Sequence, residues 1–266
     1  MRAIHDATGS TTAANATTMP RAALLRAYAQ EARCEFLRVL REPSYAAPVL
    51  AFPALFYLLF GVLLDKGDGR AASYMLATYG VFGIIGAALF GFGVTIAIDR
   101  GHGYLRLKRA LPMPPGALLL AKLAMAMLFA TLISLLLAGL AVAFGGVSLR
   151  ASQWALLVAV DVLGVLPFAA LGLFIGTLVG GNAAPAVLNL LYLPMAFLSG
   201  LWMPLAMLPE FMQQVAPVFP AYHLGQLALK VVGMDAGKPA WQHLAALAVV
   251  TVACFALAQR RLARAE

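Results

Sequence analysis

Asp161 is the residue with the clearest potential for chemistry, because it is the one acid well inside a long apolar segment. A charge within a bilayer is costly, so an acid placed there commonly belongs to a proton or ion pathway. Proton coupling would normally need a second acid or base at the same depth, and none is obvious. Asp161 is therefore a candidate intramembrane polar site. The alternative is a structural acid, hydrated near the outer end of its segment or hydrogen-bonded to a neighbouring helix.

Motifs of established enzyme classes are missing from the sequence. It contains no G-x-x-x-x-G-K-[ST] phosphate loop, no H-E-x-x-H zinc motif and no G-x-S-x-G nucleophile motif. The four histidines are scattered, and Cys34 and Cys254 have no ligand-like spacing, so we expect free thiols and no metal site. We predict a chain that is not an enzyme and holds no cofactor of its own.

The composition indicates a membrane protein. Of the 266 residues, 62% are hydrophobic and 11% are charged, whereas soluble domains are about 45–50% apolar and about 25% charged. The net charge of +8 would suggest nucleic acid as a partner of a soluble protein. In a membrane protein it is better explained by Lys and Arg gathering in cytoplasmic loops, so no nucleic-acid partner is expected.

Six segments are apolar over roughly the 20 residues that a spanning helix needs. They are too long and too uniformly apolar for barrel strands, so the predicted fold is an all-α membrane domain over residues 43–258. The segments are about 45–64, 73–98, 116–144, 152–180, 184–203 and 240–258. On the fourth, Gly172, Gly176 and Gly180 predict close helix packing, either within the subunit or at a dimer seam.

The distribution of charge predicts the orientation. With the N-terminus inside, fourteen of the nineteen Lys and Arg residues are cytoplasmic, so both termini should be cytoplasmic. We predict that residues 1–19 form a disordered tail and that residues 259–266 form a basic cytoplasmic tail. Residues 20–42 are too charged to span but suit an amphipathic helix on the inner leaflet, or else a cytoplasmic helix that contacts a partner.

Two connecting segments are unusual. Residues 101–111, on the cytoplasmic side, suit a short basic helix that Pro112 would end. Residues 204–238, on the outer side, are apolar but broken by four prolines, which favours short helices that dip into the outer leaflet.

These features together resemble the permease subunit of an ABC-2 type transporter. Members of that family carry an acid and a glycine before a short basic-apolar helix that ends in Thr-Pro, and a lysine that opens the third span. The matching positions are Asp99, Gly103, Leu105, Ala110, Pro112 and Lys122, with Leu111 in place of the threonine. A second family motif, between the fifth and sixth spans, is matched by Phe197, Ser199, Gly200, Pro204, Leu208, Pro209, Pro220 and Tyr222.

The resemblance implies a function that the residues alone do not give. Two such six-helix subunits, identical or related, would pair in the cell (inner) membrane with two ATP-binding subunits, which bind ATP and Mg²⁺. The short helix would be the coupling helix that contacts the ATPase, with Leu105 and Leu107 as apolar contacts and Arg106, Lys108 and Arg109 facing acidic residues or anionic lipids. Substrates exported by this family include drugs, antibiotics, lipids and polysaccharides.

Two other hypotheses remain open at this stage. One is a secondary carrier that works without ATP and uses Asp161 as its proton site. The other is a membrane adaptor or sensor that transports nothing.

Overall fold

The computed structural model describes residues 21–64, 69–104 and 116–264. Within these ranges the chain forms helices and no β-strand. The longer helices are α1 (Arg21–Leu40), α2 (Pro43–Phe56), α3 (Arg70–Ala88), α4 (Thr95–Gly101), α6 (Ala117–Ala143), α7 (Ala151–Leu163), α8 (Val165–Leu178), α9 (Ala184–Leu198), α11 (Pro220–Val231) and α12 (Ala240–Arg264). The shorter pieces are η1 (Tyr57–Leu63), η2 (Leu89–Val94), η3 (Leu205–Met207), α10 (Glu210–Val215) and η4 (Ala216–Val218).

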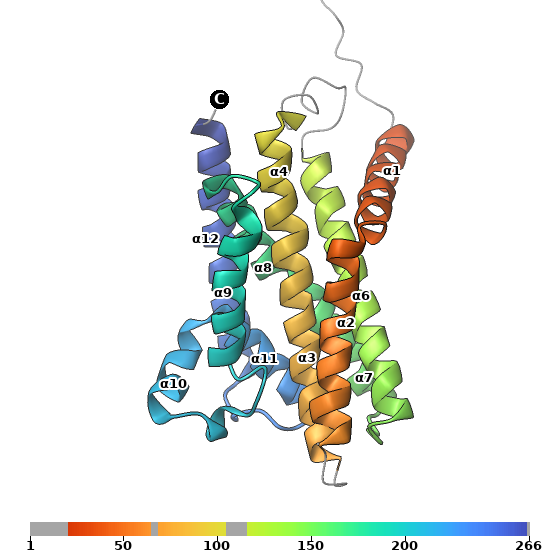
Figure 1. Ribbon diagram of the computed structural model, residues 1–266, viewed down its shortest axis with the longest axis vertical. Coiled ribbons are helices and arrows are strands. Elements are labelled where there is room, and N and C mark those ends of the chain that lie inside the picture. The colour runs from red at the N-terminus through yellow and green to blue at the C-terminus, as the bar shows by residue number, and fades with distance from the viewer. Residues whose placement is uncertain (1–20, 65–68, 105–115, 265–266) are drawn as a thin grey trace, which may run out of the picture.

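Five continuous helical segments are long and apolar enough to cross a membrane. They are Pro43–Leu63, Arg70–Gly101, Leu118–Ala143, Ala151–Leu178 and Ala240–Leu262. The prediction of an all-helical membrane domain is thereby confirmed. Figure 1 shows these segments side by side along the long axis, with the start of α1 and the end of α12 at the same end of the bundle.

The fifth predicted segment, 184–203, differs from the other five. Its helix α9 has 15 residues, and it rises only about 22 Å against a hydrocarbon core of about 30 Å. It runs along the bundle (Figure 1) and packs against η2 and α8. It ends at Leu198, and after the capping residue Ser199, Gly200 takes a left-handed conformation at φ +75° that favours glycine.

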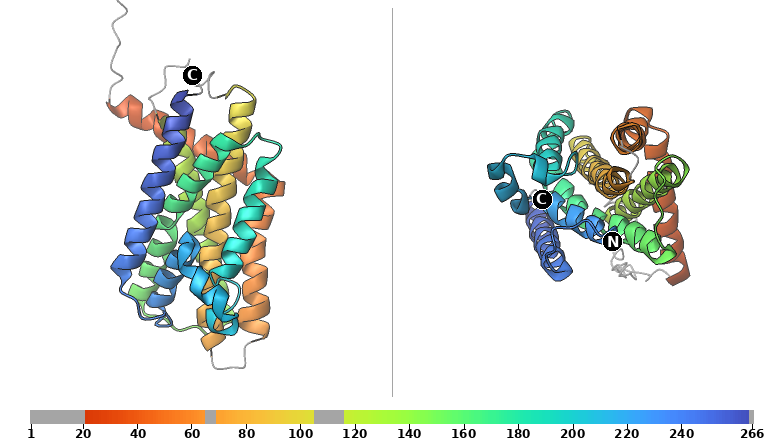
Figure 2. Two further views of the ribbon diagram at one scale, coloured as in Figure 1. Left: turned by 90° about the vertical axis from the view of Figure 1, so that its left-hand side faces the viewer. Right: turned by 90° about the horizontal axis from the view of Figure 1, so that it is seen from below.

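The segment α3–η2–α4 forms the centre of the bundle. In its most apolar window 78% of the residues are buried, against 22% for Pro43–Leu63 and 11% for Ala240–Leu262. The two outer segments therefore present most of their surface to the bilayer or to other proteins. Helix α3 packs against α2, α6, α8 and α11, and the view along the axis shows it between α9 and α2 (Figure 2).

Glycines allow α8 to approach this central segment. A methyl group added to Gly176 would lie 2.7 Å from the carbonyl oxygen of Gly93, and one added to Gly172 would lie 3.1 Å from that of Leu89. Two of the three predicted packing glycines thus form a seam inside the subunit, where no larger residue would fit. Gly180 has open space around its Cα.

Helix α1 crosses the end of the bundle where α12 ends (Figure 2). It fills most of the predicted segment 20–42 and packs against α6. At the same end, α12 remains helical through Arg264, beyond the predicted span limit at residue 258. The predicted tail 1–19 lies outside the described residues.

Proline divides the segment after α9, as the sequence predicts. Pro204 precedes η3, Pro209 precedes α10, and Pro220 is the first residue of α11. Two tyrosines of α3 hold this segment, since the Tyr74 hydroxyl donates to the Gly200 carbonyl at 2.9 Å and the Tyr79 hydroxyl donates to the Trp202 carbonyl at 3.2 Å. Tyr222 is buried, and the buried Ser199 Oγ has no hydrogen-bond partner among the described residues.

Candidate functional site

A buried ionic cluster surrounds Asp99, near the end of α4. One Asp99 carboxylate oxygen lies 3.0 Å from Lys122 Nζ on α6, and the other lies 3.5 Å from an Arg38 guanidinium nitrogen on α1. Glu35 completes the cluster, 3.5 Å from Lys122 and 3.7 Å from Arg38. Two acids and two bases make the ionic cluster (Glu35, Arg38, Asp99 and Lys122) formally neutral.

Burial explains why these charges must be paired. The Lys122 side chain is fully buried, and those of Glu35 and Asp99 are 4% exposed, whereas that of Arg38 is 50% exposed. An ammonium group removed from water loses several kcal/mol of hydration unless anions and hydrogen bonds replace it. Lys122 obtains a further contact by donating to the Thr95 hydroxyl at 3.1 Å.

The central segment positions both Thr95 and Asp99. After α3 the helix widens into the π-helical stretch η2 and then tightens again as α4. The Thr95 hydroxyl donates back to the Gly91 carbonyl at 2.6 Å, inside the widened turn, so its oxygen remains available to accept from Lys122. Thr95 and Asp99 are four residues apart and therefore lie on the same face of the helix.

Arg100 contacts a different part of the bundle. Its guanidinium donates to the Thr177 carbonyl and, at 2.8 Å, to the Val179 carbonyl. These carbonyls belong to the C-terminal end of α8, where backbone acceptors lack helical donors and the helix dipole favours a cation. Through Asp99 and Arg100, the end of α4 is held to α1, α6 and α8.

The predicted coupling helix begins where this site ends. Gly103 turns the chain after α4 with φ +75°, and Gly116 leads into α6 with φ +84°. The remaining coupling residues proposed from the sequence, Leu105, Arg106, Leu107, Arg109 and Pro112, lie outside the described residues. The structure therefore locates both ends of that connection, next to the ionic cluster.

Sequence reasoning singled out Asp99 and Lys122 but missed their partners. Glu35 and Arg38 were treated only as parts of an amphipathic helix, and Arg100 only as a cytoplasmic charge. One signal was available: Glu35 is one of three acids among residues 20–42, and it is spaced i,i+3 from Arg38. Which helix would meet that pair could not be read from the spacing.

Asp161 lies far along the chain from this cluster, in α7. It is 2% exposed, and one carboxylate oxygen accepts a hydrogen bond from the Ser134 hydroxyl on α6. The same oxygen lies against Gly80 of α3, where an added methyl group would be 3.2 Å away. Asp161 Oδ1 has no hydrogen-bond partner, and no described Lys, Arg or His forms an ion pair with the carboxylate. The acid thus joins α6 to α7 across a glycine of α3.

An aromatic groove lies between α2, α3 and α9. It encloses about 440 Å³, and its walls include seven aromatic rings: Tyr45, Phe52, Phe56, Phe82, Phe90, Tyr192 and Trp202. Phe82 and Tyr192 stack with ring centroids 4.9 Å apart, and the Tyr192 hydroxyl donates to the Phe82 carbonyl at 2.8 Å. The Tyr45 hydroxyl similarly donates to the Ala87 carbonyl at 2.8 Å. With these hydroxyls occupied, the groove presents mainly ring surface, which suits an apolar or amphipathic molecule.

A small polar cluster lies at the opposite end of the bundle from Asp99. Lys230 Nζ contacts the Asp235 carboxylate at 2.7 Å, and this hydrogen bond lowers the pKa of Asp235. His223 and His243 face each other through their Nδ1 atoms at 3.0 Å, and His223 Nε2 lies 2.9 Å from the Pro217 carbonyl. Burial lowers the pKa of His223.

Comparison with known proteins gives two matches. The family model described as "ABC-2 type transporter" matches residues 31–232. A protein of Bacillus subtilis (strain 168) named "Putative transport permease YvfS" is 29% identical over 217 residues, which cover 79% of this chain and 86% of that relative. The range matched by the family model begins inside α1 and ends just after α11, so it contains the ionic cluster, the aromatic groove and Asp161.

Proposed function

Since the chain belongs to the ABC-2 type transporter family, we propose that it is the permease subunit of an exporter driven by a separate ATP-binding subunit. ATP and Mg²⁺ would bind to that partner. This chain would supply the membrane pathway and would pair with a second copy or with a related permease. Both termini would face the cytoplasm of a cell (inner) membrane, with α9 as a short sixth crossing and the α10–α11 segment re-entering from the outer side.

The observation that carries this proposal is the set of contacts at the end of α4. Asp99 and Arg100 connect α4 with α1, α6 and α8, immediately before the predicted coupling residues 105–112. A displacement applied to residues 105–112 by an ATPase would therefore act on four helices at once. Isolated loops transmit little force, whereas buried ion pairs and a capped helix end move as one unit.

The aromatic groove supports the proposed class of substrate. Its rings offer dispersion contacts and few fixed hydrogen-bonding groups, which fits a hydrophobic or amphipathic drug, antibiotic or lipid. It is lined by α2, an outer helix with little burial, so the groove lies where a second permease copy could complete it.

The test is to co-express the chain with its ATP-binding subunit and to measure ATP-dependent export from inverted vesicles. Replacing Leu105 by Ala together with Arg106 by Asp should abolish export while membrane insertion is preserved. The matched control replaces Arg260 by Asp, which puts the same charge change at the same end of the bundle but in α12. Full export by the Leu105/Arg106 variant would refute the coupling role.

A second candidate function is favoured by one observation, the buried carboxylate of Asp161 with its unpartnered oxygen. An acid in that position could bind a proton in a carrier that works without ATP. However, the Asp161 carboxylate contacts Ser134 and Gly80, and among the described residues it meets no second acid or base. We therefore rank ATP-driven export first.

A further inference from the structure

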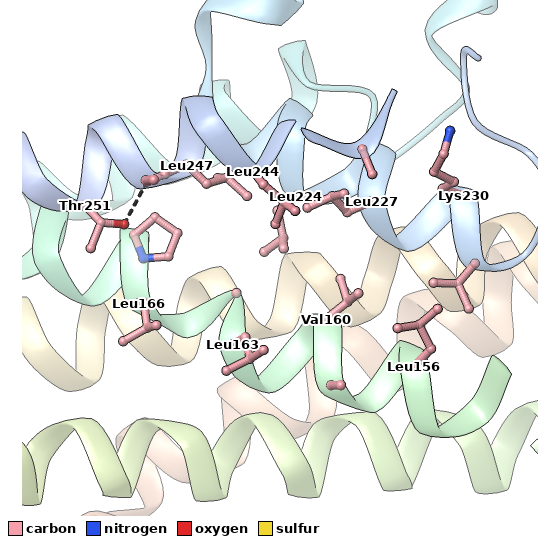
Figure 3. A pocket seen from close by; sticks show the side chains of 16 residues that line it. Leu156, Val160, Leu163, Leu166, Leu224, Leu227, Lys230, Leu244, Leu247 and Thr251 are labelled. Atoms are coloured by element: carbon pink, nitrogen blue, oxygen red, sulfur yellow. Dashed lines mark hydrogen bonds between the residues drawn. The ribbon is translucent and has the colours of Figure 1, made fainter. Parts of the chain in front are cut away.

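We propose that a groove along α12 is a binding site for one membrane phospholipid, with an acyl chain in the groove and the phosphate at Lys230. This α12 groove encloses about 530 Å³ between α7–α8, α11 and α12. Figure 3 shows leucines from all three sides pointing into it, among them Leu163, Leu224 and Leu244. It lies on a different face from the aromatic groove, with which it shares no residue.

The groove floor lies where α7 ends and α8 begins, at Gly164. Pro167, near the start of α8, has no N–H to donate to the carbonyl one turn earlier. A methyl group added to Gly164 would lie 2.6 Å from the Leu224 side chain, so the bare glycine leaves room for this leucine of α11 at the groove floor. Gly164, Pro167 and Leu224 therefore belong to the floor of the groove.

The polarity of the α12 groove changes along its length. Lys230 is the one charged side chain among the described residues that line it. The deep end contains Thr251, whose hydroxyl donates to the Leu247 carbonyl of its own helix at 2.7 Å and so is not free for a ligand (Figure 3). A ligand must therefore be apolar along most of its length and anionic at one end.

The length of the α12 groove matches one leaflet of a bilayer. Its α12 wall runs from Ala240 to Thr251, a rise of about 16 Å at about 1.5 Å per residue. Half of the hydrocarbon core of a bilayer is about 15 Å thick. Lys230 would then stand at the depth of the lipid phosphates. The assignment of this leaflet to the outer side of the membrane rests on the orientation given with the proposed function.

The charges at the mouth favour an anionic headgroup. Lys230 is 38% exposed at its side chain, and it contacts the Asp235 carboxylate and, at 2.9 Å, the Lys238 carbonyl. The charges of Lys230, Lys238 and Asp235 sum to one net positive charge. Because α12 is the least buried of the candidate spans, bilayer lipids are the molecules that surround the groove in the membrane.

The test uses the full chain in phosphatidylcholine vesicles that contain a phosphatidylglycerol with a photoreactive group in its acyl chain. After illumination, labelled peptides are mapped by mass spectrometry. We expect the label to concentrate on the α11 and α12 walls of the groove. Filling the groove with Ala248→Phe, or from the opposite wall with Ala159→Phe, should remove it. Val249→Phe, on the neighbouring face of α12 where the residue is 67% exposed, should retain it.

Charge is tested separately. Lys230→Gln should lower labelling by the anionic lipid about five-fold, the effect of one basic side chain at a membrane surface, and should change labelling by a phosphatidylcholine probe much less. Arg70→Gln removes a cation at the same end of the bundle but outside the groove, and it should have no effect.

Two results would overturn the lipid site. One is labelling that is equal in wild type and in both groove-filling variants. The other is a disulfide between two copies through Ala248→Cys, in a background that lacks Cys34 and Cys254, because a second subunit would then occupy the groove. The readout is lipid binding, so a failure of ATP-driven export would leave this result unaffected.

Discussion

Asp99 and Arg100 are neighbours in sequence, yet they hold different helices of the bundle. Asp99 pairs with Lys122 of α6 at 3.0 Å and with Arg38 of α1 at 3.5 Å, while Arg100 donates to the last carbonyls of α8. Adjacent helical residues point about 100° apart, so one short helix can contact both sides. The proposed coupling helix follows directly. A displacement of that helix would therefore be passed to α1 and α6 through Asp99 and to α8 through Arg100.

Removing the charge of Asp99 should destabilise the protein strongly. Asp99→Asn leaves the fully buried Lys122 ammonium with Glu35 as its remaining anion, and breaking a buried pair in this way costs about 3–5 kcal/mol. The free energy of unfolding of the purified protein in detergent would report this loss. Arg38→Gln is the matched control and should cost less, because Arg38 is half exposed and water screens its pair with Asp99.

A double substitution separates pairing from packing. Asp99→Asn combined with Lys122→Met removes both charges and should recover most of the stability lost in Asp99→Asn alone. If the double variant is instead as unstable as the sum of the two single variants, the two side chains act independently and the ionic cluster is not a unit.

Arg100 should be needed to couple α4 to α8. Arg100→Gln removes the charged donor from the end of α8, where hydrogen bonds to a charged group contribute about 1.5–3 kcal/mol. We expect ATP hydrolysis by the assembled transporter to continue while substrate exported per ATP falls. Arg41→Gln, an exposed arginine at the end of α1, is the control. An unchanged ratio of export to hydrolysis would show that Arg100 only stabilises the fold.

Local sequence pattern predicts much of this architecture and little of its long-range contacts. Apolar length predicts the spanning helices, and proline spacing predicts the short helices after α9, because both properties act within a few residues. The partnership of Glu35 with Lys122 depends on how α1 crosses the bundle, which residue spacing cannot indicate. Gly172 and Gly176 predicted close packing, but only the structure shows Gly93 as the partner within the same subunit.

The aromatic groove should set the substrate preference. Phe52 lines it and is 54% exposed, so Phe52→Ala should remove ring contacts without opening a hole in the core. Losing one aromatic contact of about 0.5–1.5 kcal/mol should weaken binding of a lipophilic dye about two- to ten-fold. Phe255→Ala, which removes a ring from the surface of α12, should leave dye binding unchanged. Equal effects of the two substitutions would place the dye in the bilayer and not in the groove.

Asp161 distinguishes the two candidate functions. Asn at this position keeps an oxygen that can accept from the Ser134 hydroxyl, so Asp161→Asn should preserve the link between α6 and α7 and with it ATP-dependent export. Asp161→Leu, which leaves that hydroxyl without an acceptor, should cost about 1–3 kcal/mol of stability. Transport in liposomes is the measurement, once with ATP and the ATP-binding subunit, and once with a proton gradient alone. Gradient-driven transport by the wild type that Asp161→Asn abolishes would establish a proton carrier instead, since that substitution removes the ionisable group and keeps the hydrogen bond.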